Sequence, residues 1–252
     1  MSAFVPAMLA AYCALGLATG FLAGLLGVGG GLIIVPVLIM QFHAQGLAAG
    51  MEPQLALGTS LATILFTSVS SVRAHHRHGA VEWPVVRRIA GGALAGTLAG
   101  AMLAAQVPAQ VLKIFFVLFL FYAAIQMWLD FKPAPQRAMP GRAATAAAGG
   151  VIGAVASWVG IGGGTLSVPF MLWHNVPLHR AIATSAAIGF PIALAGAVGY
   201  VLGGWDKPGL PAGSLGFVYL PALAGIVAGS VLTAPLGART THRLPVRPLK
   251  RI

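Results

Sequence analysis

The stretch GVGGGLIIVPVL at residues 27–38 occurs a second time, as GIGGGTLSVPFML at residues 160–172. The prolines of the two copies, Pro36 and Pro169, lie 133 residues apart, which is also the spacing of the glycine runs. A glycine run interrupts an apolar helix, because glycine costs about 1 kcal/mol in a helix interior. The doubled motif therefore predicts two corresponding helix breaks, each followed by a short apolar helix that its proline kinks or ends.

The composition of the chain places these breaks in a membrane. Of its 252 residues, 58% are hydrophobic before glycine is counted and 8% are charged, whereas soluble domains carry about 25% charged residues. So few charges cannot cover so much apolar surface in water, which excludes an ordinary soluble domain and a disordered chain. The 34 glycines fit a polytopic helical protein, because helix interfaces in lipid favour small residues.

The apolar runs form two similar series. Each half contains several long apolar runs and one short run. None of them alternates polar and apolar residues as the strands of a β-barrel do. In the first half they are 4–26, 32–42, 55–72, 86–105 and 112–129, and in the second half 143–159, 165–173, 181–202 and 217–236. The runs at 32–42 and 165–173 are shorter than the roughly 20 residues that a spanning helix needs.

The basic residues change place between the two halves. Residues 73–88 are strongly basic, whereas their counterpart at 203–209 is neutral. Conversely, residues 106–110 are uncharged, and their counterpart at 239–251 holds four arginines and a lysine. Because lysine and arginine accumulate in cytoplasmic loops, the two halves are predicted to have opposite orientations.

We therefore predict an all-α polytopic membrane protein of two inverted-topology repeats with glycine-broken short helices or re-entrant segments. The repeats are residues 1–131 and 143–252, joined by a cytoplasmic linker at 132–142. The protein is expected in the cell membrane, a bacterial inner membrane, with its N-terminus outside and residues 73–88, 132–142 and 239–252 in the cytoplasm. The N-terminus and these segments are assigned to the same sides of the membrane whether residues 4–42 form a re-entrant hairpin or two full crossings.

The second repeat ends earlier than the first. Residues 244–250 (LPVRPLK) resemble residues 107–113 (VPAQVLK), which lead into the apolar run at 114–129. The chain ends at Ile252, so the second repeat is expected to lack its last helix within this sequence.

These residues resemble a known family. The repeated glycine break with its apolar stretch and proline, the Thr-Ser pairs at 59–60 and 184–185, and the basic loop are similar to the sulfite exporter TauE/SafE family. The resemblance covers nearly the whole chain. It implies a membrane transporter of small sulfur-containing anions such as sulfite, sulfonates or sulfoacetate.

The glycine breaks also provide a candidate anion site. The four acidic residues lie at or near span ends or loops, which counts against a cation substrate. A break frees backbone N–H groups at the positive end of the following helix, and hydroxyls can donate to sulfonate oxygens, although they also bond backbone carbonyls. The predicted substrate-binding residues are Gly29, Gly30, Gly31, Thr59, Ser60, Gly162, Gly163, Gly164, Thr165, Thr184 and Ser185.

The favoured function is a secondary transporter that alternates access to a midplane site between two inverted halves. An anion channel and a membrane-embedded scaffold subunit are the alternatives. The apolar runs hold no catalytic or metal-binding constellation, so we expect no enzyme activity, cofactor or metal, and His75, His76 and His78 are assigned to a solvated loop. The expected partners are the anion, membrane lipid and a coupling ion, proton or sodium, with a homodimer left open and nucleic acid excluded.

Overall fold

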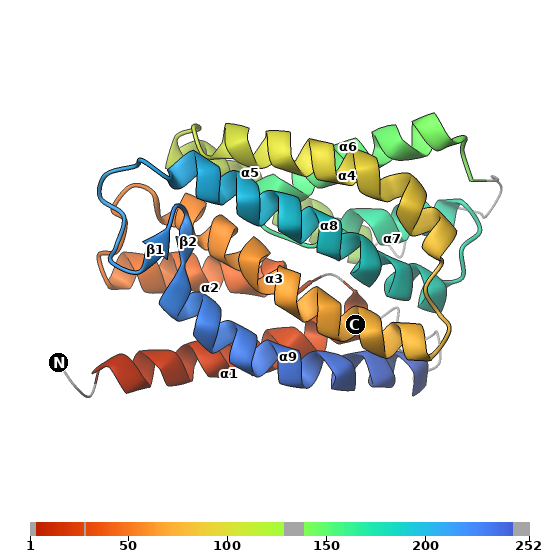
Figure 1. The fold of residues 1–252 in the computed structure, drawn as a ribbon, viewed down its shortest axis with the longest axis horizontal. Helices are drawn as coiled ribbons and strands as arrows, with labels where there is room; N and C mark the ends of the chain where they lie inside the picture. Colours follow the sequence, from red (N-terminus) through yellow and green to blue (C-terminus); the bar gives the residue numbers. More distant parts are fainter. Residues whose placement is uncertain (1–3, 28, 129–138, 244–252) are drawn as a thin grey trace.

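The computed structural model describes residues 4–27, 29–128 and 139–243. Over these ranges the chain forms nine helices and one short β-hairpin (Figure 1). The elements in chain order are α1 (Phe4–Leu26), α2 (Gly31–Ala44), α3 (Glu52–Arg77), α4 (Trp83–Ala104), α5 (Ala109–Trp128), α6 (Arg142–Val159), α7 (Gly164–Trp173), α8 (Leu178–Gly204), β1 (Ser214–Leu215), β2 (Val218–Tyr219) and α9 (Leu220–Arg243).

Six of the described helices are long and apolar enough to cross a membrane. They cover Met8–Leu26, Glu52–Arg77, Ala109–Gln126, Arg142–Val159, Leu178–Gly204 and Leu220–Arg243. A further helix, α4, has 22 residues and packs between α6 and α8. The helices α2 and α7 have 14 and 10 residues, which is shorter than a full span. The predicted all-helical polytopic class is confirmed.

The antiparallel pair β1–β2 was not expected from the sequence. Its register pairs Ser214 with Tyr219 and Leu215 with Val218. The hairpin takes up the start of the apolar run predicted at 217–236, so α9 begins only at Leu220.

Each glycine break turns the chain back on itself. The helices α1 and α2 enter from one end of the molecule and return to it, whereas α6 and α7 do so from the opposite end (Figure 1). The breaks meet halfway along the bundle, because Gly29 lies against Ile64 in the middle of α3 and Gly162 against Gly189 in the middle of α8. In the structure α1 has 23 residues, enough to span a membrane, whereas α2, which runs back from the break, has 14.

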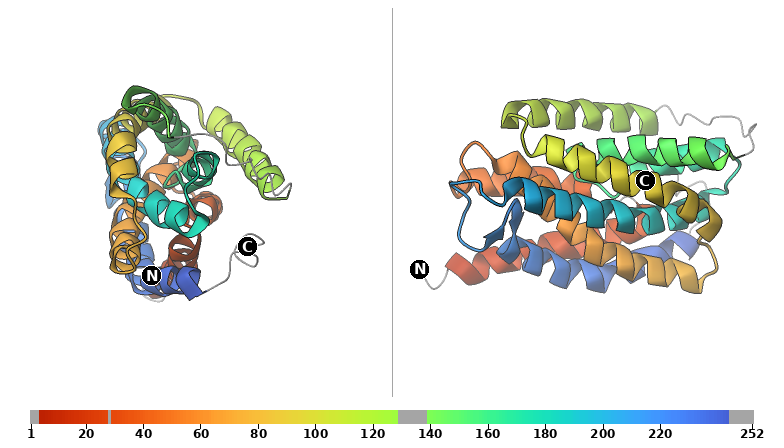
Figure 2. Two further views of the ribbon diagram at one scale, coloured as in Figure 1. Left: turned by 90° about the vertical axis from the view of Figure 1, so that its right-hand side faces the viewer. Right: turned by 45° about the horizontal axis from the view of Figure 1, so that its top comes forward.

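The two halves pack in the same pattern. The helix α1 lies on α9 as α6 lies on α4, and α2 lies on α3 as α7 lies on α8. At the centre α3 and α8 pack against each other, flanked by α9 and α4 respectively. If α1, α2, α3 and α4 are exchanged with α6, α7, α8 and α9 in that order, the same set of helix pairs results. The helix α5 is not part of this exchange and contacts α6 and α3 (Figure 2). The first helix of each half therefore packs on the fourth helix of the other half.

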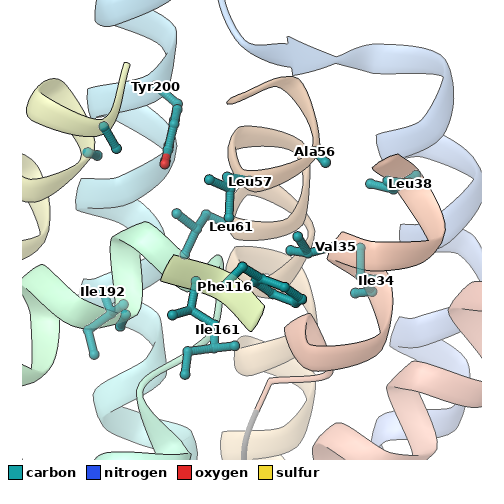
Figure 3. Close-up of a cluster of buried hydrophobic side chains, with 14 of the residues drawn as sticks. Ile34, Val35, Leu38, Ala56, Leu57, Leu61, Phe116, Ile161, Ile192 and Tyr200 are labelled. Carbon is teal, nitrogen blue, oxygen red and sulfur yellow. The ribbon is translucent and has the colours of Figure 1, made fainter. Parts of the chain in front are cut away.

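Apolar side chains from both halves share one buried core. Figure 3 shows Ile34 and Val35 of α2 beside Leu57 of α3, with Ile161 of the second break and Ile192 of α8 in the same cluster. All five are at most 2% exposed. The core thus surrounds the two breaks and holds them in the interior.

The basic segment at 73–88 is mostly helical, which corrects the expectation of a solvated loop. The helix α3 continues to Arg77 and α4 begins at Trp83, so the connection is only residues 78–82. His75 is fully buried rather than solvated, because its ring packs between α1 and α9. Residues 132–138 of the predicted linker, residues 244–252, and the helix expected to be missing after them lie outside the described residues.

Close packing of α4 on α6 supports a direct test with two neighbouring glycines. A methyl group at Gly92 would collide with the carbonyl oxygen of Ala146, whereas a methyl group at Gly91 would meet nothing within 4 Å. We expect Gly92→Ala to destabilise the protein by about 1–3 kcal/mol through overpacking. Gly91→Ala should be neutral or stabilising by about 0.5–1 kcal/mol. Thermal unfolding in detergent measures both, and equal effects would contradict the observed α4–α6 contact.

Candidate functional site

The two glycine breaks share a left-handed backbone conformation at two corresponding positions, while Gly29, with φ 85°, differs from its counterpart Gly162. The first glycines, Gly27 and Gly160, have φ values of 69° and 72°, and Gly30 and Gly163 have φ values of 76° and 77°. Positive φ is unfavourable for residues with a β-carbon, which explains why glycine stands at these four positions. Gly30 and Gly163 are the N-cap residues of α2 and α7, and neither helix start has a side-chain cap. Each break therefore ends in a helix N-terminus with its positive dipole end in the core.

The serines of the two Thr-Ser pairs connect the breaks across the halves. Ser60 Oγ donates to the carbonyl oxygen of Gly160 at 2.7 Å. Ser185 Oγ lies 3.1 Å from the carbonyl oxygen of Gly27 and 2.8 Å from that of Ile182 in its own helix, so these two carbonyls share its proton. Each serine thus bonds the break of the other half. These carbonyls belong to interrupted helices, and the serines satisfy them in the buried interior.

The threonines of the same pairs accept hydrogen bonds from the backbone just before α9 and α4. The amide of Tyr219, just before α9, donates to Thr59 Oγ1 at 2.9 Å. The amide of Glu82, just before α4, donates to Thr184 Oγ1 at 3.0 Å. Both Thr-Ser pairs are fully buried, so in this conformation the four hydroxyls that were predicted to bind substrate bond the protein itself.

The breaks touch each other at a small central cavity. The amide nitrogen of Gly162 lies 3.1 Å from where a β-carbon on Gly29 would stand. The cavity has a volume of about 10 Å³, which is the space of about one water molecule. Its lining residues are Ala23, Gly27, Gly29, Ile64, Thr67, Ser68, Ser71, Gly162, Ala186 and Gly189.

The remaining predicted residues surround this cavity rather than line it. A β-carbon on Gly30 would meet the Thr19 carbonyl, and one on Gly31 would collide with the carbonyl of Gly160. A β-carbon on Gly163 would likewise collide with the Ile192 side chain. These glycines therefore allow close backbone packing around the breaks.

In the first turn of α7, Gly164 is buried and Thr165 is half-buried. The hydroxyl oxygen of Thr165 is itself buried, and it has no hydrogen-bond partner in the part of the chain that the structure describes. This hydroxyl is therefore available to a ligand that reaches the start of α7.

Three hydroxyl residues of α3 line the cavity and were missed in the sequence. Thr67 Oγ1 lies 2.8 Å from Ser230 Oγ of α9, and Ser68 Oγ donates to the Leu65 carbonyl at 3.0 Å. Ser71 Oγ is buried and has no hydrogen-bond partner among the described residues. A sequence pattern could have indicated this face of α3: Thr63, Thr67 and Ser71 recur at four-residue spacing on an apolar helix and therefore lie on one side of it.

The residues that line the cavity determine which ligands it can bind. It consists of hydroxyls, glycine backbone and apolar side chains, and no ionisable side chain is part of it. Hydroxyl and N–H donors at uncapped helix N-termini suit an oxyanion. Such a set binds through hydrogen bonds and dipoles rather than through a fixed positive charge.

A buried histidine, His75, lies one helical turn beyond Ser71 and contacts two neighbouring helices. His75 Nε2 lies 3.1 Å from the carbonyl oxygen of Gly24 on α1, and its Nδ1 lies 2.9 Å from His242 Nε2 on α9. The rings of His78 and His179 also face His242, with centroids 4.5 and 6.3 Å away. His75 thus ties α3 to both α1 and α9 at the basic end of the molecule.

The acidic residues that the structure describes lie away from this centre. Glu52 contacts His43 at 3.4 Å at one end of the bundle, and Glu82 pairs with Arg180 at 2.6 Å at the other. Within residues 4–27, 29–128 and 139–243, no three His, Cys, Asp or Glu side chains gather in a way that would hold a metal ion.

The crossed serine bonds are expected to dominate local stability. Ser60→Ala leaves the buried Gly160 carbonyl without its donor, and Ser185→Ala does the same to the Gly27 carbonyl. Each substitution should cost about 1–3 kcal/mol. Thr240→Ala is the control, because Thr240 bonds the Leu236 carbonyl of its own helix at an accessible position, and it should cost less than about 0.5 kcal/mol. Unfolding midpoints of the three variants in one detergent test this, and a Ser60→Ala protein as stable as the control would refute it.

Comparison with known proteins agrees with this architecture. The family model described as Sulfite exporter TauE/SafE matches residues 12–252. A Haemophilus influenzae protein described as a probable membrane transporter protein is 35% identical over 94% of this chain and 90% of its own length.

More distant relatives extend the similarity. The Bacillus subtilis probable membrane transporter protein YunE is 28% identical over 94% of this chain and 90% of its own length. The Methanocaldococcus jannaschii probable membrane transporter protein MJ0441 is 25% identical over 93% and 87%. No solved structure matches the chain. The family match over most of the sequence and the 35% identical relative show that the chain belongs to the TauE/SafE sulfite exporter family and is a multi-pass membrane transporter.

Proposed function

We propose that this protein moves a small sulfur-containing oxyanion by alternating access, with the substrate held between the two glycine breaks. The proposed moving parts are two inverted-topology repeats, residues 1–131 and 143–252. The hairpins α1–α2 and α6–α7 enter from opposite ends, and their helix contacts exchange in pairs, as such repeats require. The family description of sulfite export supplies the substrate class.

The observation that carries the proposal is the cavity where the breaks meet. It is lined by Gly29 and Gly162, which stand directly before the uncapped starts of α2 and α7, and by a buried hydroxyl, Ser71 Oγ, that has no partner in the described part of the chain. Ser71 Oγ is one of eight buried side-chain oxygens without a partner among the described residues, and it is the one of them that lines this cavity. An oxyanion would accept from Ser71 and from the backbone amides at the breaks.

The conformation described here is a closed one in this scheme. A cavity of about 10 Å³ holds a water molecule and is too small for a sulfur atom with several oxygens. Binding therefore requires the hairpins to separate. On the basic side, the contacts of His75 with Gly24 and His242 form the closed gate. The positive-inside rule puts that gate in the cytoplasm and the N-terminus outside.

A channel would use the same cavity but would only equilibrate the anion across the membrane. Proteoliposomes with a radiolabelled anion inside and outside distinguish the two. A transporter exchanges label against unlabelled substrate and accumulates it under an imposed proton or sodium gradient, whereas a channel shows no accumulation beyond the electrical driving force.

Substitution of Ser71 tests the site. Because its hydroxyl has no partner among the described residues, Ser71→Ala should leave thermal stability unchanged. Loss of a hydrogen bond to a charged ligand should lower anion affinity about tenfold to a hundredfold, as measured by uptake of labelled sulfite, sulfoacetate and taurine into proteoliposomes. The matched control is Ser70→Ala, whose hydroxyl instead bonds the Val231 carbonyl on the outer face. Normal uptake of all three anions by a well-folded Ser71→Ala protein would place the site elsewhere.

Substitution of His75 tests the gate. A cysteine at position 71, in a protein carrying Cys13→Ser, reports whether water reaches the cavity. In inside-out vesicles we expect His75→Ala to raise its labelling rate by a water-soluble thiol reagent at least about tenfold, as a local opening of about 1.4 kcal/mol would do. His76→Ala is the control, because His76 is exposed and contacts Trp83 outside the bundle. Unchanged labelling in His75→Ala, or an equal rise in His76→Ala, would contradict the gate.

A further inference from the structure

A second hollow lies on the outer face of the bundle, away from the central cavity. It is a groove of about 490 Å³ between α3 and α9 near the basic end. Its lining shares no residue with the cavity between the breaks. Phe66 and Val231, at 48% and 37% exposure, show that it opens to the surroundings of the protein. This groove plays no part in the transport scheme above.

One end of the groove is strongly basic. Arg73 and Arg77 of α3 and Arg239 of α9 line it, together with His78. None of the three arginines has an ion-pair partner among the described residues, since Glu52 and Glu82 pair with His43 and Arg180. Three like charges from two adjacent helices repel one another, and a bound anion would relieve that repulsion.

The other end of the groove is apolar. On both helices the apolar residues come before the arginines along the chain. Along α3, Phe66 and Val69 precede Arg73, and along α9, Val231 and Pro235 precede Arg239. Each helix therefore presents apolar side chains toward the middle of the bundle and arginine at its end. An inorganic anion would contact only the arginines, whereas an anionic lipid would use both parts.

We propose that this groove binds one anionic phospholipid, with its phosphate among Arg73, Arg77 and Arg239 and an acyl chain along Phe66 and Val231. Arginine forms paired hydrogen bonds with phosphate oxygens. Three arginines also favour a headgroup with a net negative charge over a zwitterionic one, whose ammonium group they would repel. Basic pockets between membrane helices are suited to such lipids. The occupant is the lipid of the surrounding leaflet, so the site needs no soluble ligand.

The bound lipid would strengthen the α3–α9 interface. At the groove, Ser70 Oγ donates to the Val231 carbonyl at 2.9 Å, and behind it Thr67 and Ser230 are in contact at 2.8 Å. The lipid bridges arginines of both helices across the same seam. Its binding should therefore raise thermal stability even where no transport substrate is present.

The test uses the full chain in a neutral detergent, with phosphatidylglycerol or phosphatidylcholine added. We expect phosphatidylglycerol to raise the unfolding temperature and phosphatidylcholine to leave it unchanged. The triple variant Arg73→Gln, Arg77→Gln, Arg239→Gln should weaken the apparent affinity for phosphatidylglycerol about a hundredfold, since each arginine near a membrane surface contributes a comparable share.

The matched control removes the same charge from the same end of the molecule. Arg87, Arg88 and Arg243 are exposed and do not line the groove, so their triple replacement by Gln should keep the lipid response. An equal loss in both triple variants would show a general charge effect and overturn the proposal. Equal stabilisation by inorganic phosphate or glycerol phosphate would reduce the groove to a site for small anions and overturn the lipid assignment. These outcomes are independent of whether the protein transports sulfur anions.

Discussion

The structure depends on two hydrogen bonds that cross between the halves, from Ser60 to the Gly160 carbonyl and from Ser185 to the Gly27 carbonyl. A helix broken in the interior leaves carbonyls that no water can satisfy. Because the donor for each break lies in the other half, neither break is satisfied until both halves have packed. The left-handed glycines, the close contacts of α1 with α9 and of α4 with α6, and the meeting of α3 with α8 are all consistent with this requirement.

The crossing also links the two breaks mechanically. A hairpin that shifts relative to the other half stretches its own serine bond and, through the α3–α8 contact, disturbs the serine that serves the opposite break. The breaks are therefore suited to changing conformation together, which a carrier with one site between two halves needs. The threonine bonds to the amides of Tyr219 and Glu82 extend this link to the starts of α9 and α4.

Much of the fold could be predicted from the sequence because hydropathy and glycine act locally. The run at 4–26 matches α1, and the breaks fall where the doubled motif put them. The burial of His75 could not be predicted, since its hydrogen-bond partners Gly24 and His242 are distant in sequence. The hydroxyl-bearing face of α3 that includes Ser71 is visible in the sequence, but the cavity beside it could not be predicted, because it forms only where the breaks of both halves meet.

If both proposals hold, the central cavity binds its anion weakly and the outer groove binds its anion strongly. A carrier has to release its substrate, and a buried arginine would hold an oxyanion through paired, charge-assisted bonds that are hard to break. It would also be costly to leave uncompensated when the site is empty. The central cavity avoids both problems by offering neutral donors: Thr67 and Ser68 are hydrogen-bonded within the protein, and the Ser71 hydroxyl is uncharged, so leaving it unpaired costs less than an unpaired arginine. The arginines are instead placed on the outer groove, where a lipid that never needs to leave can neutralise them. Under the proposed mechanism, neutral donors in the interior and fixed charges on the outer face both follow from one requirement, that the transported anion be bound only briefly.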